Sequence, residues 1–283
     1  MKVSGFTIVK NGVYYAYPFR EAILSILPLC DEMIVNVGKS EDETLEIVKS
    51  LRDSYGKIKI IESEWDMTLK EGKVLSVETN KALKECIGDW CFYIQGDEVL
   101  HEKYYNTVSS ALNKYLISKQ TEGLRFYYKH FYGTYDYYQD NYRNWYLREV
   151  RIIKNNDDIV SWGDAMDFRH RDGSKINSND IDAEIYHYGW VRPPESLIRK
   201  RKDFEKLYNT GEVAEKNISG FQNYDDLGNL KRFTNTHPGV MKERLAGSQW
   251  DFNPELDKQK PDWLRKILIF IQPFTKRIFK VKK

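Results

Sequence analysis

The feature that most constrains the fold of this chain is a regular alternation of short apolar segments with amphipathic helical segments. The apolar segments are typical of buried strands and cover 5–9, 33–37, 57–61 and 90–94. Apolar residues at helical spacing follow each of them, in 18–27, 45–55, 72–87 and 101–116. Strands joined by crossover helices run parallel, so the sequence predicts an α/β fold with a mostly parallel central sheet flanked by helices. Ligands bind such sheets beyond the carboxyl ends of the strands, which here are 10–12, 38–42, 62–72 and 95–98.

The second half of the chain is less regular. Strand-like segments cover 122–128, 150–154 and 185–190, and a basic amphipathic helix is expected over 195–208. Signals after this helix are weak. We therefore expect a main domain over 1–210 and a less regular, helical C-terminal extension over 211–283.

Charge is concentrated at the C-terminus. The 283 residues carry a formal net charge of +2, but 262–283 holds seven Lys or Arg against one acidic residue, which leaves −4 for the rest. An acidic body argues against a protein that coats nucleic acid. Apolar and aromatic residues are interleaved with the basic ones in 262–283, so we predict peripheral contact with an anionic membrane. The alternative is a helix packed on the body with a solvated lysine tail.

Compartment and membrane topology are also constrained. No apolar run approaches the ~20 residues that a spanning helix needs, and the N-terminal apolar stretch ends at Lys10-Asn11 without a cleavage site for a signal peptide. The three cysteines are odd in number and lack metal-site spacing. We expect a reduced, cytoplasmic protein.

The sharpest motif is Tyr93-Ile94-Gln95-Gly96-Asp97-Glu98. An apolar strand runs into a glycine and then two carboxylates, an arrangement with which α/β enzymes hold a divalent cation over phosphates. The alternative is that Asp97 and Glu98 only precede the next helix, where acidic residues suit the helix dipole.

The order of these segments resembles glycosyltransferase family 2, which has the nucleotide-sugar-binding GT-A fold. Five pieces carry the likeness, which covers roughly residues 3–210: Lys10-Asn11 after the first strand; Val37 to Thr44, similar to D-D-G-S-x-D-G-T; Glu71-Gly72 with Asn80 to Leu83, similar to G-x-x-x-x-R-N-x-G-L; Gln95 to Glu98 at the D-x-D motif; and His187-Tyr188-Gly189-Trp190, similar to the H-Y-G-[YW] element of a bacterial subgroup that builds surface polysaccharide.

The resemblance implies transfer of a sugar, with inversion, from a nucleotide-sugar donor to a carbohydrate or lipid-linked acceptor. The implied donor-binding residues are Asn11, Gly38, Asp42, Glu71, Asn80, Gln95, Gly96 and Arg192. The chain departs from the family in two motifs. Val37 and Gly38 replace the paired Asp residues that read the base, so the base is left open, and Gln95 replaces the first Asp of the metal motif.

Asp97 and His187 are the expected ligands of Mn²⁺ or Mg²⁺, and an imidazole favours Mn²⁺. The alternative for His187 is an ordinary hydrogen-bonded histidine in a strand. The family's catalytic base is expected in the segment 161–167, with Asp164 as the first choice and Asp167 as the second. Either could instead be a turn residue.

Aromatic residues make up 11 of the 21 positions in 126–146. They suit either a sugar-stacking acceptor platform or a tyrosine-rich hairpin packed against the domain or a partner subunit. Two other functions stay open: a nucleotidyltransferase, and a non-catalytic carbohydrate- or nucleotide-binding protein that retains the fold.

Overall fold

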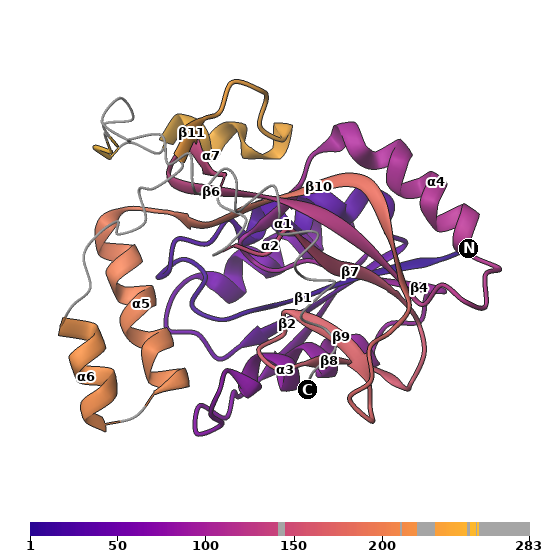
Figure 1. Ribbon diagram of the computed structural model, residues 1–283, viewed down its shortest axis with the longest axis horizontal. Coiled ribbons are helices and arrows are strands. Elements are labelled where there is room, and N and C mark those ends of the chain that lie inside the picture. Colours follow the sequence, from indigo (N-terminus) through magenta and orange to yellow (C-terminus); the bar gives the residue numbers. More distant parts are fainter. Residues whose placement is uncertain (141–144, 210, 220–229, 248–249, 253, 255–283) are drawn as a thin grey trace, which may run out of the picture.

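The computed structural model describes residues 1–140, 145–209, 211–219, 230–247, 250–252 and 254. Its first half is the predicted α/β unit (Figure 1). Four neighbouring parallel strands form it in the order β3-β2-β1-β4: β1 (Val3–Val9), β2 (Glu32–Gly38), β3 (Ile58–Ser63) and β4 (Trp90–Tyr93). The connecting helices are α1 (Phe19–Ile26), α2 (Thr44–Tyr55) and α3 (Lys73–Lys84). The α/β class is therefore confirmed.

The three inner strands β2, β1 and β4 are buried on both faces, which explains their mainly hydrophobic runs, whereas β3 lies at the sheet edge with Lys59 exposed. In β4, Trp90 and Phe92 face the core beneath α1 and α2, whereas Cys91 and Tyr93 face the core beneath α3. The alternation follows the two-residue period of a strand. A three-layer arrangement results, and the carboxyl ends of the parallel strands are left at one edge.

The second half extends the same sheet with mixed strand directions. From β4 the order continues β7-β6-β10-β5, and β11 pairs with β6. Only the β6–β10 pair is parallel in this part. These strands are β5 (Glu98–Leu100), β6 (Gly123–Gln139), β7 (Arg148–Lys154), β10 (Ser178–Val191) and β11 (Leu230–Arg232). The long, curved β6 and β10 run beside each other across Figure 1.

The aromatic segment forms strand and core rather than a separate hairpin. Strand β6 runs to Gln139, well beyond the predicted end at 128. Phe131 and Tyr135 are buried with Tyr186 and Tyr188 of β10 in a third apolar cluster. Packing therefore accounts for most described rings of this segment. Trp145 and Tyr146 lie beyond the strand.

A hairpin and several helices complete the described structure. The hairpin of β8 (Ile159–Trp162) and β9 (Asp167–His170) packs beside α3. Helix α4 (Tyr105–Tyr115) contacts β10, and α5 (Pro194–Tyr208) follows β10 directly, with α6 (Gly211–Ser219) packed against α5. Helix α7 (Lys242–Gly247) is short.

The membrane and domain predictions concern the C-terminal part of the chain. Within the described ranges no helix is both long and apolar enough to cross a membrane. The segment 262–283 lies outside the described residues, so its contact with a membrane stays a prediction. The division at residue 210 also stays a prediction.

Candidate active site

A cavity of about 250 Å³ opens at the predicted edge of the sheet. Its floor comes from the ends of β1 and β4, through Lys10, Asn11 and the turn 95–97. One wall is the turn 164–166 of the β8–β9 hairpin, and another is α5. The cavity therefore joins segments that are far apart in the sequence.

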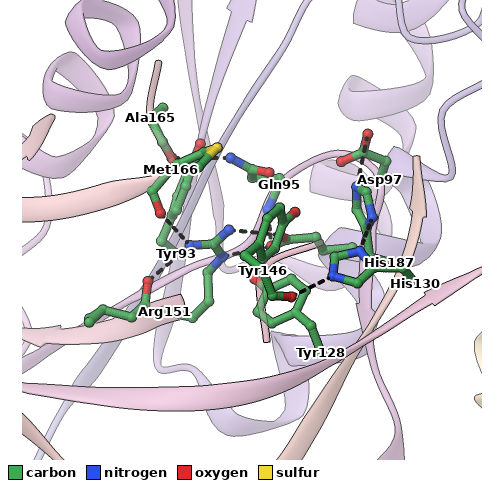
Figure 2. A network of polar contacts seen from close by, with 12 residues as sticks. Tyr93, Gln95, Asp97, Tyr128, His130, Tyr146, Arg151, Ala165, Met166 and His187 are labelled. Carbon is green, nitrogen blue, oxygen red and sulfur yellow. Dashed lines mark hydrogen bonds and ion pairs between the residues drawn. The ribbon is translucent and has the colours of Figure 1, made fainter. Parts of the chain in front are cut away.

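Asp97 and His187, the two expected metal ligands, both line this cavity, and Figure 2 shows their side chains close together. Asp97 follows β4 and His187 lies in β10, and the Asp97 Oδ2 atom is 3.8 Å from His187 Nε2. A Cβ at Gly189 would lie 2.4 Å from His187 Nε2 and 2.9 Å from Asp97 Oδ2, so this glycine keeps the space beside both atoms open. Bonds of about 2.1 Å to a cation could span the gap.

A lysine on α5 completes this cluster. The Lys200 ammonium on α5 donates to Asp97 Oδ2 at 3.2 Å and to the Gly189 carbonyl at 3.3 Å. Burial raises the pKa of Asp97, but Lys200, His187 and Arg192 outweigh burial and hold that pKa well below its usual range. Burial lowers the pKa of Lys200 to about 8. The carboxylate and the ammonium are therefore both charged near neutral pH.

Arg192 supports the site from beneath. Arg192 is 1% exposed, and its guanidinium donates to the carbonyls of Tyr15 and Gly189, at 2.8 and 2.7 Å. It also lies over the Tyr17 ring. In this arrangement it anchors the irregular stretch of β10 that follows His187.

His187 is hydrogen-bonded on its far side to a second histidine. His187 Nδ1 lies 2.9 Å from His130 Nδ1, and His130 Nε2 lies 2.8 Å from the Tyr146 carbonyl oxygen. Burial lowers the pKa of His130 to about 3 and that of His187 to about 4. Both imidazoles are neutral near neutral pH.

The two adjacent carboxylates of the motif have separate roles. Glu98 is fully buried and accepts both Arg151 Nε and Nη2 at 2.8 Å. It also accepts the Tyr128 hydroxyl at 2.7 Å and the Gln95 backbone N–H at 3.1 Å. Figure 2 shows Arg151 and Asp97 on different sides of this network. Glu98 holds the turn in place from below, whereas Asp97 faces the cavity.

Three predicted donor-binding residues line the cavity: Asn11, Gln95 and Gly96. The Gln95 side-chain amide donates to the Ala165 carbonyl at 3.1 Å, which ties the floor to the hairpin wall. The Asn11 side chain accepts the Glu41 N–H at 3.1 Å.

The two candidate bases are separated by the structure. Asp164 lines the cavity, and its Oδ2 atom accepts the Tyr208 hydroxyl of α5 at 3.0 Å. Asp167 is not among the lining residues of the described chain; it accepts the Phe168 N–H and lies 3.6 Å from Arg169. The geometry favours Asp164.

The remaining predicted donor-binding residues lie outside the cavity lining in the described chain. Asp42 accepts the N–H groups of Tyr14 and Thr44 and so holds the start of α2. Asn80 bonds the backbone of Ser161 in both directions. Glu71 pairs with Lys73 at the surface.

Gly38 also lies outside the lining, beneath Trp65, where a Cβ would approach the indole Nε1 to 2.5 Å. Sequence reasoning missed Trp65, which lines the cavity. It follows the carboxyl end of β3, so its place in the sheet was the available signal. It also missed His130 and Tyr208, for which the sequence carries no local signal.

No protein-family model matches the chain, and no curated protein matches its sequence. Among solved structures, S. aureus TarS is 15% identical, with a TM-score of 0.43; the match covers 77% of this chain and 42% of that one. TarS 1–349 in complex with UDP-GlcNAc matches at 15% identity over 77% and 70%, with a TM-score of 0.41.

Mycobacterium tuberculosis glucosyl-3-phosphoglycerate synthase, in complex with Mn²⁺, UDP-glucose and phosphoglyceric acid, matches at 19% identity over 45% of this chain and 44% of that one, with a TM-score of 0.32. The chain thus spans less than half of the length of this synthase and of the longer TarS chain. Because these identities and TM-scores are low, they carry no functional argument, and the function of the chain is inferred from the residues of the site itself.

Proposed function

We propose that the chain is a glycosyltransferase of GT-A type that moves a sugar, with inversion, from a nucleotide-sugar donor to a hydroxyl of a carbohydrate or lipid-linked acceptor. One observation carries the proposal: the Asp97 carboxylate and His187 Nε2 converge beside an open space in a cavity that Asp164 also lines. Cation-binding groups and a candidate base therefore share one cavity.

The donor's diphosphate would lie near the strongest charges of the cavity. Asp97 and His187 would hold Mn²⁺ or Mg²⁺, which when bound supplies positive charge to the leaving nucleoside diphosphate. Described residues contain no group of three His, Cys, Asp or Glu side chains placed for a metal, so further ligands would come from the diphosphate and water, as is common for Mg²⁺. Lys200 adds a second positive charge beside Asp97.

Asp164 is the proposed base. An inverting transfer needs a carboxylate that takes the proton of the attacking hydroxyl as the new bond forms. Asp164 is only partly buried, and its Oδ2 atom accepts the Tyr208 hydroxyl. Tyr208 would orient this carboxylate and could yield its hydrogen bond to an acceptor hydroxyl.

Thermal shifts with nucleoside diphosphates, with and without Mn²⁺, test the proposal. A ligand at a hundredfold excess over its Kd raises the free energy of unfolding by about 2.7 kcal/mol. We expect this stabilisation to need both the diphosphate and Mn²⁺ and to disappear in Asp97→Ala. The matched control is Asp167→Ala, which removes a carboxylate outside the cavity and should keep it.

Hydrolysis of a nucleotide-sugar panel then tests the chemistry. UDP-GlcNAc and UDP-glucose are the first donors to include, because they are bound in the structures named above. Diphosphate binding that is indifferent to Mn²⁺, together with no hydrolysis of any donor, would favour the non-catalytic binding protein.

A further inference from the structure

We propose that His130 is a positioning residue that fixes the proton of His187 on Nδ1 and leaves Nε2 with a lone pair facing Asp97. The proton positions follow from the partners of the heavy atoms. The role that we assign to this tautomer, an unprotonated Nε2 that can bind a cation, depends on the proposed function.

Strand register brings the two rings together. His130 in β6 and His187 in β10 are direct partners in the parallel pairing of these strands, so their side chains leave the same face of the sheet. The rings stand nearly perpendicular, with centroids 5.0 Å apart. Both residues are buried, 3% and 7% exposed.

The proton assignment starts at Tyr146. A backbone carbonyl only accepts hydrogen bonds, so His130 Nε2, 2.8 Å from the Tyr146 oxygen, must carry a proton. A neutral imidazole has one proton, so Nδ1 of His130 is an acceptor. The 2.9 Å contact between the two Nδ1 atoms is then a hydrogen bond only if His187 donates from Nδ1.

The other side of the His187 ring agrees with this assignment. His187 Nε2 and Asp97 Oδ2 are 3.8 Å apart, beyond the range of a hydrogen bond. A proton on Nε2 would draw the carboxylate to about 2.8 Å. The observed separation of these two atoms, with the lysine ammonium on the carboxylate, is the arrangement expected when both atoms are acceptors.

His130 is itself held in place on several sides. The Tyr128 ring stacks on it, with centroids 5.6 Å apart, and the Tyr146 ring meets it edge-on at 4.6 Å. The Tyr128 hydroxyl is fixed in turn by Glu98. The buried network beneath the cavity therefore determines the orientation of His130. Partners of this kind orient metal-binding histidines and set which nitrogen binds.

Imidazole ¹H–¹⁵N correlation spectra test the tautomer directly in the full chain, without metal or donor. The chain has five histidines, and His187→Asn identifies the signal of His187 by its loss. At neutral pH we expect the pattern of a neutral ring protonated on Nδ1. A ring protonated on Nε2, or on both nitrogens, would overturn the proposal.

Variants of His130 test the cause. His130→Asn keeps a carbonyl oxygen near the place of Nδ1 and should preserve the His187 pattern, whereas His130→Leu removes the acceptor and should shift the proton toward Nε2. The matched control is His237→Asn, which alters a half-buried histidine whose Nε2 also bonds a backbone carbonyl, that of Tyr135. An unchanged His187 signal in His130→Leu would refute the role of His130; if that variant does not fold, the wild-type and His130→Asn spectra still decide.

Binding of Mn²⁺, followed by electron paramagnetic resonance, gives the consequence. Loss of such a partner typically weakens metal binding 10- to 100-fold, and we expect this for His130→Leu with recovery in His130→Asn. Equal affinity in both variants would contradict the positioning role. The spectra need neither metal nor nucleotide-sugar donor. If His187 shows the expected tautomer but the protein hydrolyses no donor, the proposed function is overturned and this inference is not.

Discussion

Replacing Glu98 by glutamine is expected to lower the free energy of unfolding by about 4 kcal/mol, although the side chain keeps its shape. Glu98 and Arg151 are both 0% exposed at their side chains, and two of the four hydrogen bonds that Glu98 accepts come from the guanidinium. Glutamine would turn an amide N–H₂ toward these donors and leave the guanidinium without a counter-charge. Breaking a buried pair in this way costs about 3–5 kcal/mol.

The neighbouring substitution Asp97→Asn provides the contrast. Asp97 lies at the cavity wall, and an amide oxygen can still accept the Lys200 ammonium, but the carboxylate charge beside that ammonium is lost, so we expect a smaller loss of about 2 kcal/mol. This variant should lose Mn²⁺-dependent stabilisation by nucleoside diphosphate, which Glu98→Gln should retain below its melting temperature. The two residues therefore separate stability from ligand binding.

Urea denaturation at constant pH measures the free energy of unfolding of both variants. In thermal denaturation, the Tm of Glu98→Gln should fall by about 10 °C, given about 2–4 °C per kcal/mol for a chain of this size. Replacing Glu98 and Arg151 together by leucine should recover part of the loss, because no unpaired charge remains. A loss under about 1 kcal/mol for Glu98→Gln, or an equal loss for Asp97→Asn, would refute the reasoning.

Three further predictions follow from the same contacts. Asp164→Asn should lower kcat by about 10²–10⁴ in a donor-transfer assay while Asp167→Asn stays near wild type; the reverse order would exchange their roles. Lys200→Gln should tighten Mn²⁺ binding in a calorimetric titration, because it removes a cation that neutralises the Asp97 carboxylate, and weaker binding would show that Lys200 assists the metal. The free energy of unfolding should fall as the pH drops from 6.5 toward 4. Burial lowers the pKa of His187 to about 4 and that of His130 to about 3, so over this range the unfolded chain takes up protons that the folded chain does not. The free energy of unfolding then falls by at most about 2.7 kcal/mol per pH unit. Denaturation curves that are flat between pH 6.5 and 4 would show that these rings are protonated in the fold.

The parallel half of the sheet was predictable because its inner strands are buried on both faces. Runs such as 33–37 read as continuous apolar segments, and crossover helices leave few other topologies. The same logic located the edge of the sheet where the cavity lies, and Asp97 within it. The second half could not be read in this way, since the extent of β6 depends on rings of β10 that lie some 50 residues away and pack against Phe131 and Tyr135.

The site was predictable only where a motif is local. Spacing could not separate Asp164 from Asp167, because the choice depends on which way each side chain leaves the hairpin. Asp42 and Asn80 suit a family motif, yet each is occupied with backbone groups nearby. His130 could not be found from the sequence, because its relation to His187 exists only through the register of two strands 57 residues apart.

That register has a consequence for how the chain tolerates change in length. The pairing of β6 with β10 is irregular between Asp180 and Glu184, and again between His187 and Trp190. The four residues 184–187 between these irregularities pair in step with β6. A residue gained or lost there would turn one imidazole to the opposite face, whereas the irregular stretch 180–184 could absorb it. Insertions that preserve function should therefore occur before residue 184 and be absent from residues 184–187.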